Sequence, residues 1–136
     1  MVLGEVKMGL SVKSEPKDGY LLIIVSGEYG SPPIPEVIDR VLDHCKEHKP
    51  SKVLVDIRPM TGNIPAMDRF YFGEVFSGRF YEEKKRGNIS HIRFAFIGHY
   101  PIVDPNKFGE TVAVNRGMTL KVTTDLKEAL DWILVE

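Results

Sequence analysis

The sequence has little of what several common protein classes require. It contains a single cysteine, Cys45, so no disulfide can form within the chain, and this fits a reducing compartment. No apolar run approaches the roughly 20 residues that span a bilayer, and the first residues lack the apolar core of a secretion signal. The net charge is only −1, with both signs interspersed, so no nucleic-acid or anionic-membrane surface is indicated. We therefore expect a cytoplasmic protein with no membrane span and no nucleic-acid partner.

Motifs of catalysis and cofactor binding are also missing. The "TGN" segment at 61–63 lacks the spacing of a phosphate-binding loop, and no G-x-S-x-G nucleophile motif occurs. His44 and His48 lie one helical turn apart, but a structural zinc site needs four ligands and a zincin helix needs a glutamate directly after its first histidine. Two exposed histidines near a helix end are therefore the preferred interpretation. We predict that the chain is not an enzyme and holds no metal and no cofactor.

Apolar patterns in the rest of the chain predict an α/β fold. Strands are expected at 6–12, 20–27, 52–57, 92–98 and 119–124. The first and last of these alternate like edge strands, and 20–27 is continuously apolar, as in a strand covered on both faces. Helices are expected at 34–49 and 66–86, from Pro105 with Asp104 as N-cap, and from Leu126 with Asp125 and Glu128 as a capping box. This order predicts one domain over 1–136: a single mixed sheet of about five strands, antiparallel at its start and parallel afterwards, with four helices.

The helix expected at 66–86 has aromatic residues on two faces. At about 100° per residue, one stripe contains Met67, Phe70, Tyr71, Val75 and Tyr81. The opposite stripe contains Phe72, Phe76 and Phe80. If the first stripe covers the sheet, the second faces outward as an apolar surface, and the sequence leaves the rotation of the helix open. Three interpretations of the second stripe stay open: an interface with a second copy, one wall of a pocket for a hydrophobic small molecule, or a surface covered by the following helix.

A polar rim is expected at the carboxyl ends of the strands, where α/β sheets bind ligands. Three loops should converge there, and their candidate residues for a ligand or partner are Tyr29, Arg58, Thr61, Asn63, His99, Tyr100 and Asp104. Arg58 could bind a carboxylate or phosphate through two hydrogen bonds. A polar loop end without a ligand, with Asp56 and Arg58 paired locally, is the alternative.

Three stretches carry a resemblance to a known family: "KVLVDIRPM" at 52–60, "IRFAFIGH" at 92–99 and "FGETVAVNRGMTLKVTTDLKEALDWI" at 108–133. With the element order above, the chain resembles the STAS superfamily, in its SpoIIAA-like group that borders on lipid-binding Sec14-type domains. The best-known members are switched by phosphorylation in an Asp-Ser-Ser-Gly-like motif. That motif is absent, because Ile64, Pro65, Ala66 and Met67 occupy its place and Thr61 is the nearest hydroxyl residue. Whether Thr61 is phosphorylated is left open.

The resemblance implies a small module that binds a protein or a ligand. We predict a non-catalytic regulatory or protein-interaction module that self-associates as a homodimer through the aromatic helix. The alternative is a carrier or sensor of an apolar or lipid-like small molecule, held between the 66–86 helix and the sheet.

Overall fold

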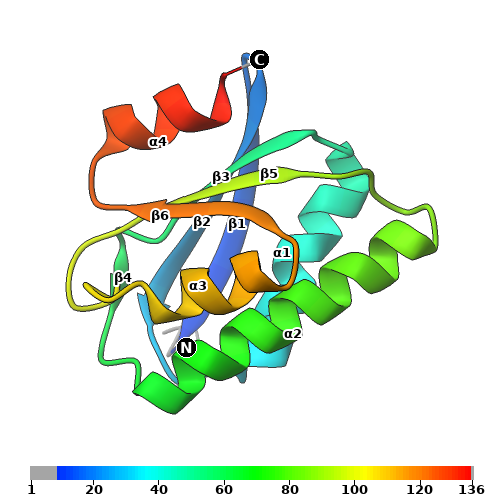
Figure 1. The fold of residues 1–136 in the computed structure, drawn as a ribbon. Helices are drawn as coiled ribbons and strands as arrows, with labels where there is room; N and C mark the ends of the chain where they lie inside the picture. The colour runs from blue at the N-terminus through cyan, green and yellow to red at the C-terminus, as the bar shows by residue number, and fades with distance from the viewer. Residues whose placement is uncertain (1–8, 136) are drawn as a thin grey trace, which may run out of the picture.

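A mixed sheet with helices on both faces forms the centre of the molecule (Figure 1). The computed structural model describes residues 9–135. The strands are β1 (Leu10–Lys17), β2 (Tyr20–Glu28), β3 (Lys52–Asp56), β4 (Met60–Thr61), β5 (Arg93–Ile97) and β6 (Thr119–Thr123). The helices are α1 (Ile34–His48), α2 (Ala66–Lys85), α3 (Phe108–Asn115) and α4 (Leu126–Ile133). The predicted fold class, with a mixed sheet and four helices, is confirmed.

The strand order is β1-β2-β3-β5-β6, with β4 beside the end of β2. β1 and β2 form an antiparallel hairpin that turns at Asp18 and Gly19, where Gly19 has a positive φ of 90° that favours glycine. The other pairs are parallel, as predicted. β4 was not predicted, because two residues are too few for a periodic signal. The predicted first strand also included Val6 and Met8, which lie outside the described residues.

The two faces of the sheet are covered unequally. Helices α1 and α2 lie over one face with α3 beside α2, and α4 lies over the other (Figure 1). Ala129 and Ile133 of α4 pack on β3 and β5. Ile23 of β2 is fully buried on the α1 side, whereas Ile24 on the opposite side is only half-buried. The prediction that 20–27 is covered on both faces therefore holds fully for one face only.

α2 has the opposite rotation to the one supposed from the sequence. Phe76 and Phe80 are 1% and 0% exposed, whereas Met67 and Tyr71 are 73% and 47% exposed. The ring of Phe76 lies edge-on to Phe94 of β5, with 5.0 Å between centroids. The phenylalanine stripe, including the half-buried Phe72, therefore faces the sheet and not solvent.

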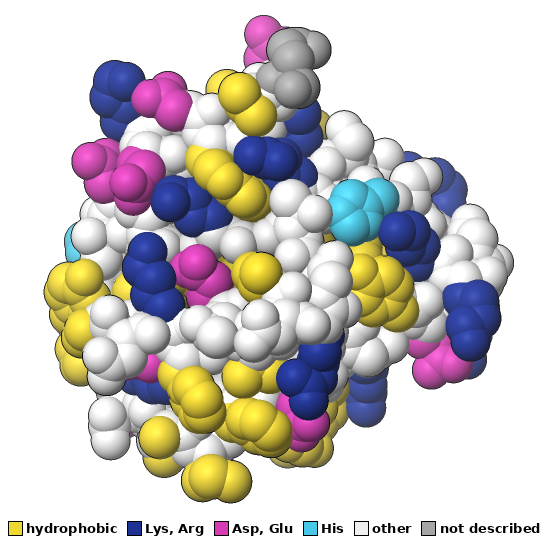
Figure 2. Space-filling view, viewed as in Figure 1, with side chains coloured by type: hydrophobic (Ala, Val, Ile, Leu, Met, Phe, Trp, Pro, Cys, Tyr) yellow, Lys and Arg dark blue, Asp and Glu magenta, His cyan; other side chains and the backbone are white. Residues whose placement is uncertain are grey.

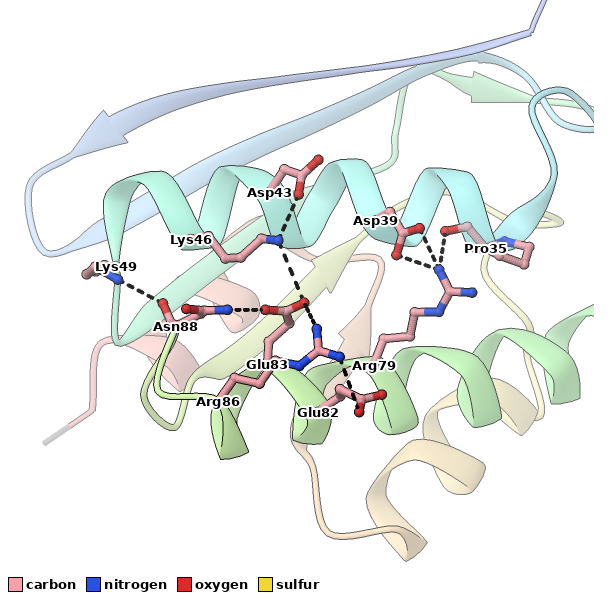
Figure 3. A network of polar contacts seen from close by, with 10 residues as sticks. All are labelled: Pro35, Asp39, Asp43, Lys46, Lys49, Arg79, Glu82, Glu83, Arg86 and Asn88. Carbon is pink, nitrogen blue, oxygen red and sulfur yellow. Dashed lines mark hydrogen bonds and ion pairs between the residues drawn. The ribbon is translucent and has the colours of Figure 1, made fainter.

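Charged residues explain this orientation. The side of α2 that holds Met67 also holds Glu74, Glu82 and Lys85, and charged side chains stay in water unless they are paired. The charged residues beside the phenylalanine stripe are paired instead, with partners on α1 (Figure 3). The side that holds Glu74, Glu82 and Lys85 faces solvent, where the first two pair with the arginines Arg116 and Arg86.

Ion pairs connect α2 to α1 along the edge of their contact (Figure 3). The guanidinium of Arg79 lies 2.5 Å from the Asp39 carboxylate. The Glu83 carboxylate accepts a hydrogen bond of 2.7 Å from Asn88 and lies 3.6 Å from the Lys46 ammonium. The hydrogen bond from Asn88 is the main reason why the pKa of Glu83 lies below its ordinary value, and the positive charge of Lys46 adds to it.

The starts of the last two helices differ from the sequence predictions in detail. α3 begins at Phe108, and Asp104 accepts hydrogen bonds from the backbone N–H groups of Asn106 and Phe108 at 3.0 and 2.9 Å. Asp104 thus closes the turn before the helix, and its predicted N-cap role is wrong. Asp125 does cap α4, whereas the Glu128 carboxylate accepts from the Thr123 hydroxyl, so the reciprocal half of the capping box does not form. Within residues 9–135, no helix has the length and apolarity of a membrane span.

Candidate functional site

An apolar cavity of about 150 Å³ lies between the sheet and helices α1 and α2. The strands contribute Val25, Val55, Phe96, Leu120 and Val122 to its lining. α1 contributes Ile34, Val37, Ile38 and Val41. α2 contributes Phe72 and Phe76. Two of the three phenylalanines singled out in the sequence therefore form part of this wall.

The volume of this cavity limits what it could hold. An apolar cavity of about this volume in another protein binds one benzene molecule. The space therefore fits one benzene-sized group or the end of an aliphatic chain.

Polar side chains line one part of the cavity. The Tyr29 hydroxyl donates a hydrogen bond of 2.7 Å to the Asp68 carboxylate, and both residues belong to the lining together with Arg69, Asp104, Lys107 and Glu110. Burial raises the pKa of Tyr29, and the hydrogen bond to Asp68 raises it further, so the phenol stays protonated. A ligand with an apolar body and a polar end would find a matching partner here.

Arg69 connects the two segments that border this polar part. Its guanidinium donates to three backbone carbonyl oxygens: Nε to Ile64 at 3.1 Å, Nη1 to Ile102 at 2.8 Å and Nη2 to Pro101 at 2.7 Å. The side chain thus joins the loop before α2 to the loop after β5. The sequence did not single out Arg69 as a site residue, because no local pattern indicates which distant carbonyls a guanidinium will meet.

The seven predicted rim residues do not form one site. Tyr29 and Asp104 belong to the cavity lining, whereas the remaining five do not. Thr61 contacts Tyr29 through its backbone, since its carbonyl accepts from the Tyr29 N–H at 2.9 Å. Asn63, His99 and Tyr100 are exposed on the loops.

Arg58 is engaged by a carboxylate of its own chain. Its Nε and Nη2 donate to the two carboxylate oxygens of Asp56 at 2.9 and 2.8 Å, and its backbone N–H donates to the first of them at 3.0 Å. Burial raises the pKa of Asp56, but the hydrogen bonds and charge of Arg58, with a contribution from His99, leave it below its ordinary value. The local pair foreseen as an alternative is present, and it occupies the fork that an anionic ligand would need.

The one thiol is not activated for chemistry. Cys45 is fully buried among apolar residues, and this burial raises its pKa to about 12. A thiol that stays protonated at neutral pH is a poor nucleophile and a poor metal ligand. The groups around the cavity are instead suited to binding a ligand: an apolar wall, the Tyr29–Asp68 pair and flanking charged side chains.

Comparisons with known proteins place the fold. No family model matches the sequence, and no curated protein matches it significantly. Among solved structures, the chain is similar to an anti-sigma factor antagonist from Mycobacterium paratuberculosis, with a TM-score of 0.54, 14% identity, and coverage of 92% of this chain and 94% of that one. It is also similar to an uncharacterized protein with a SpoIIAA-like fold from Shewanella loihica, with a TM-score of 0.51, 17% identity, and coverage of 97% and 99%. The chain therefore has the STAS/SpoIIAA-like fold.

Proposed function

We propose that this chain is a one-domain, non-catalytic regulatory module that acts by binding another protein. One similar solved structure is an anti-sigma factor antagonist, a name that implies action on another protein. The observation that supports the proposal in this chain is an exposed apolar surface on α2 and α3, formed by Met67, Phe70, Tyr71 and Phe108. We call it the α2–α3 patch.

The α2–α3 patch has the properties of an interaction surface. Met67 and Tyr71 are 73% and 47% exposed, and the ring of Phe70 lies 6.0 Å from that of Phe108, which joins the two helices into one surface. Figure 2 shows hydrophobic side chains gathered at the bottom of the view, where Figure 1 places the start of α2. Exposed apolar surface rimmed by charges is typical of protein interaction sites.

The partner we propose for this patch is a second copy of the chain. A two-fold axis places the same residues opposite one another, so the patch must complement itself. Charges of both signs lie beside it, because Glu74 of α2 and Arg116 after α3 pair at 2.7 Å. In a symmetric dimer, Glu74 of one copy could therefore lie near Arg116 of the other, and like charges need not come into contact. This proposal keeps the aromatic helix as the interface and replaces the buried phenylalanine stripe by the opposite face.

The first prediction tests this interface. We expect the wild-type chain to show a sedimentation coefficient that rises with concentration, and Tyr71→Glu to remain a folded monomer, because a carboxylate at the centre of an apolar interface would be desolvated without a partner. Lys85→Glu is the matched control on the same exposed side of α2, and it should associate like the wild type. A wild type that stays monomeric at every concentration would refute self-association.

A second candidate function is supported by the cavity. A carrier or sensor of an apolar or lipid-like molecule would hold it between α2 and the sheet, where Phe72 and Phe76 form one wall and the Tyr29–Asp68 pair lies nearby. Moving an apolar group from water onto this apolar wall would be favourable.

The second prediction tests this candidate with benzene as the probe. Titration of the wild type is expected to shift the amide NMR signals of Phe72 and Phe76, and Val37→Phe should suppress the shifts because the larger ring takes up cavity space. Val114→Phe, an exposed position on α3 outside the lining, is the control and should respond like the wild type. Equal responses in the two variants would exclude binding in this cavity.

A further inference from the structure

A cluster of three potential metal ligands lies at the C-terminal end of α1. His44, Glu47 and His48 each present a ligand atom, and these atoms all lie within 4.8 Å of one another. Bonds of about 2.0–2.2 Å to a shared ion would place the ligand atoms roughly 3–4 Å apart. Small side-chain rotations on this helix would therefore bring the three atoms to one ion. Glu47 therefore adds a third potential ligand to the two histidines noted in the sequence.

A neighbouring strand already orients one of these histidines. The Oγ of Ser14 on β1 lies 2.6 Å from Nδ1 of His44, and β1 runs along α1 (Figure 3). When Nδ1–H donates to the serine oxygen, the lone pair of Nε2 is left for a metal. Histidine ligands in metalloproteins commonly make such a hydrogen bond through the second ring nitrogen, and it fixes the ring.

The charges around the cluster favour a cation. The C-terminal end of a helix carries a negative partial charge, and Glu47 adds a full one. The two lysines nearest in the sequence are turned to other partners: Lys46 Nζ lies 3.2 Å from Asp43 and 3.6 Å from Glu83, and Lys49 donates to the Asn88 carbonyl at 2.9 Å (Figure 3). Their positive charges are thus held toward α2.

We propose that His44, Glu47 and His48 bind one divalent transition-metal ion, with Ser14 as a positioning residue. Two imidazoles and one carboxylate suit Zn²⁺, Ni²⁺ or Cu²⁺ better than Ca²⁺ or Mg²⁺, which prefer oxygen ligands alone. Three protein ligands leave the remaining positions to water. The bound ion would strengthen the connection between α1 and the edge strand β1, because the serine and the imidazole belong to these two elements. This inference does not depend on the cavity or on the α2–α3 patch.

The test is calorimetric titration of the full chain with Zn²⁺ alone. We expect one equivalent to bind, His48→Ala and Glu47→Gln each to weaken binding at least tenfold, and Ser14→Ala to weaken it about tenfold, as supporting residues around metal sites do. His99→Ala removes a histidine on an exposed loop and should leave the affinity unchanged. Metal-free thermal unfolding of each variant checks that the fold is kept.

Two results would overturn the proposal. In one, the wild type binds Zn²⁺ no more tightly than a His44→Ala, His48→Ala double variant. In the other, His99→Ala lowers the affinity as much as His48→Ala does, which would mean that histidines bind the ion wherever they stand.

Discussion

Replacing Phe76 with alanine is expected to lower the free energy of unfolding by about 3–5 kcal/mol, the range for large aromatic residues in cores. The side chain is 1% exposed, and its ring lies 5.0 Å from that of Phe94 and 6.0 Å from that of Phe96. Phe76 also borders the existing cavity, so its removal would enlarge that space, and neighbouring side chains could not easily collapse into it. We therefore expect a value in the upper part of the range, measured by urea unfolding.

Tyr71→Ala is the matched control, because it removes an aromatic ring from the same helix on the opposite face. Tyr71 is 47% exposed in the single chain. At a protein concentration low enough to keep the chain monomeric, its truncation should therefore lower the free energy of unfolding by less than about 1 kcal/mol, as surface substitutions usually do. Equal losses in the two variants, or a larger loss for Tyr71, would contradict the orientation of α2 in the structure.

The two faces of α2 show where sequence periodicity reaches its limit. Both faces carry apolar residues at helical spacing, so the pattern defines the helix but not its rotation. Charges decide the rotation here. Arg79 and Glu83 can lie beside the buried stripe because Asp39 and Lys46 of α1 meet them, whereas Glu74 and Lys85 lie on the outer side. Those partners belong to a helix about 40 residues away, and a single sequence does not reveal them.

The sheet was easier to predict than the helix rotation. The strands β2, β3, β5 and β6 each have enough consecutive or alternating apolar residues to stand out, and the intervening helices impose parallel neighbours. The strand β4 was not predicted, because its two residues are too few to show an apolar pattern. Asp104 followed by Pro105 looked like a helix start, yet it forms a turn, because Asp104 accepts equally well from the backbone of Asn106 and Phe108.

The cavity could not be predicted from the sequence at all. Its lining residues come from three helices, six strands and the loops between them, and each apolar residue alone looks like an ordinary core residue. An absence of packing is a property of the assembled core, not of any segment. Only the excess of phenylalanine on α2 gave a hint, and a pocket wall was one of three interpretations that the sequence left open for that stripe.

Arg69 provides the second large effect, since Arg69→Ala is expected to lower the free energy of unfolding by about 2–4 kcal/mol. Hydrogen bonds from charged donors contribute about 1.5–3 kcal/mol each. Three backbone carbonyls lose such a donor in the alanine variant. The total loss is smaller than the sum because water can reach the exposed Pro101 carbonyl. The alanine variant should also lose amide hydrogen-exchange protection in the loop at 98–107, which the guanidinium ties to α2. Both quantities are measured on the same samples, by urea unfolding and by exchange.

Two variants separate the geometry of Arg69 from its charge. Arg69→Lys keeps the positive charge but replaces a planar fork by one ammonium group, which cannot reach three carbonyls in different directions, so it should recover only part of the loss. Arg79→Ala removes an arginine of the same helix that pairs with the half-exposed Asp39, and a pair of this kind contributes about 0.2–1 kcal/mol. If Arg69→Ala were no more destabilising than Arg79→Ala and left the loop equally protected, the three carbonyl contacts would not hold the polar side of the cavity together. The expected difference between these two arginines follows from their acceptors. Arg79 has one long carbonyl contact, 3.4 Å to Pro35, beside the exposed Asp39 carboxylate, which can turn to water. Arg69 has three carbonyl acceptors, and oxygens that lose their donor in a partly buried loop cannot all turn to water.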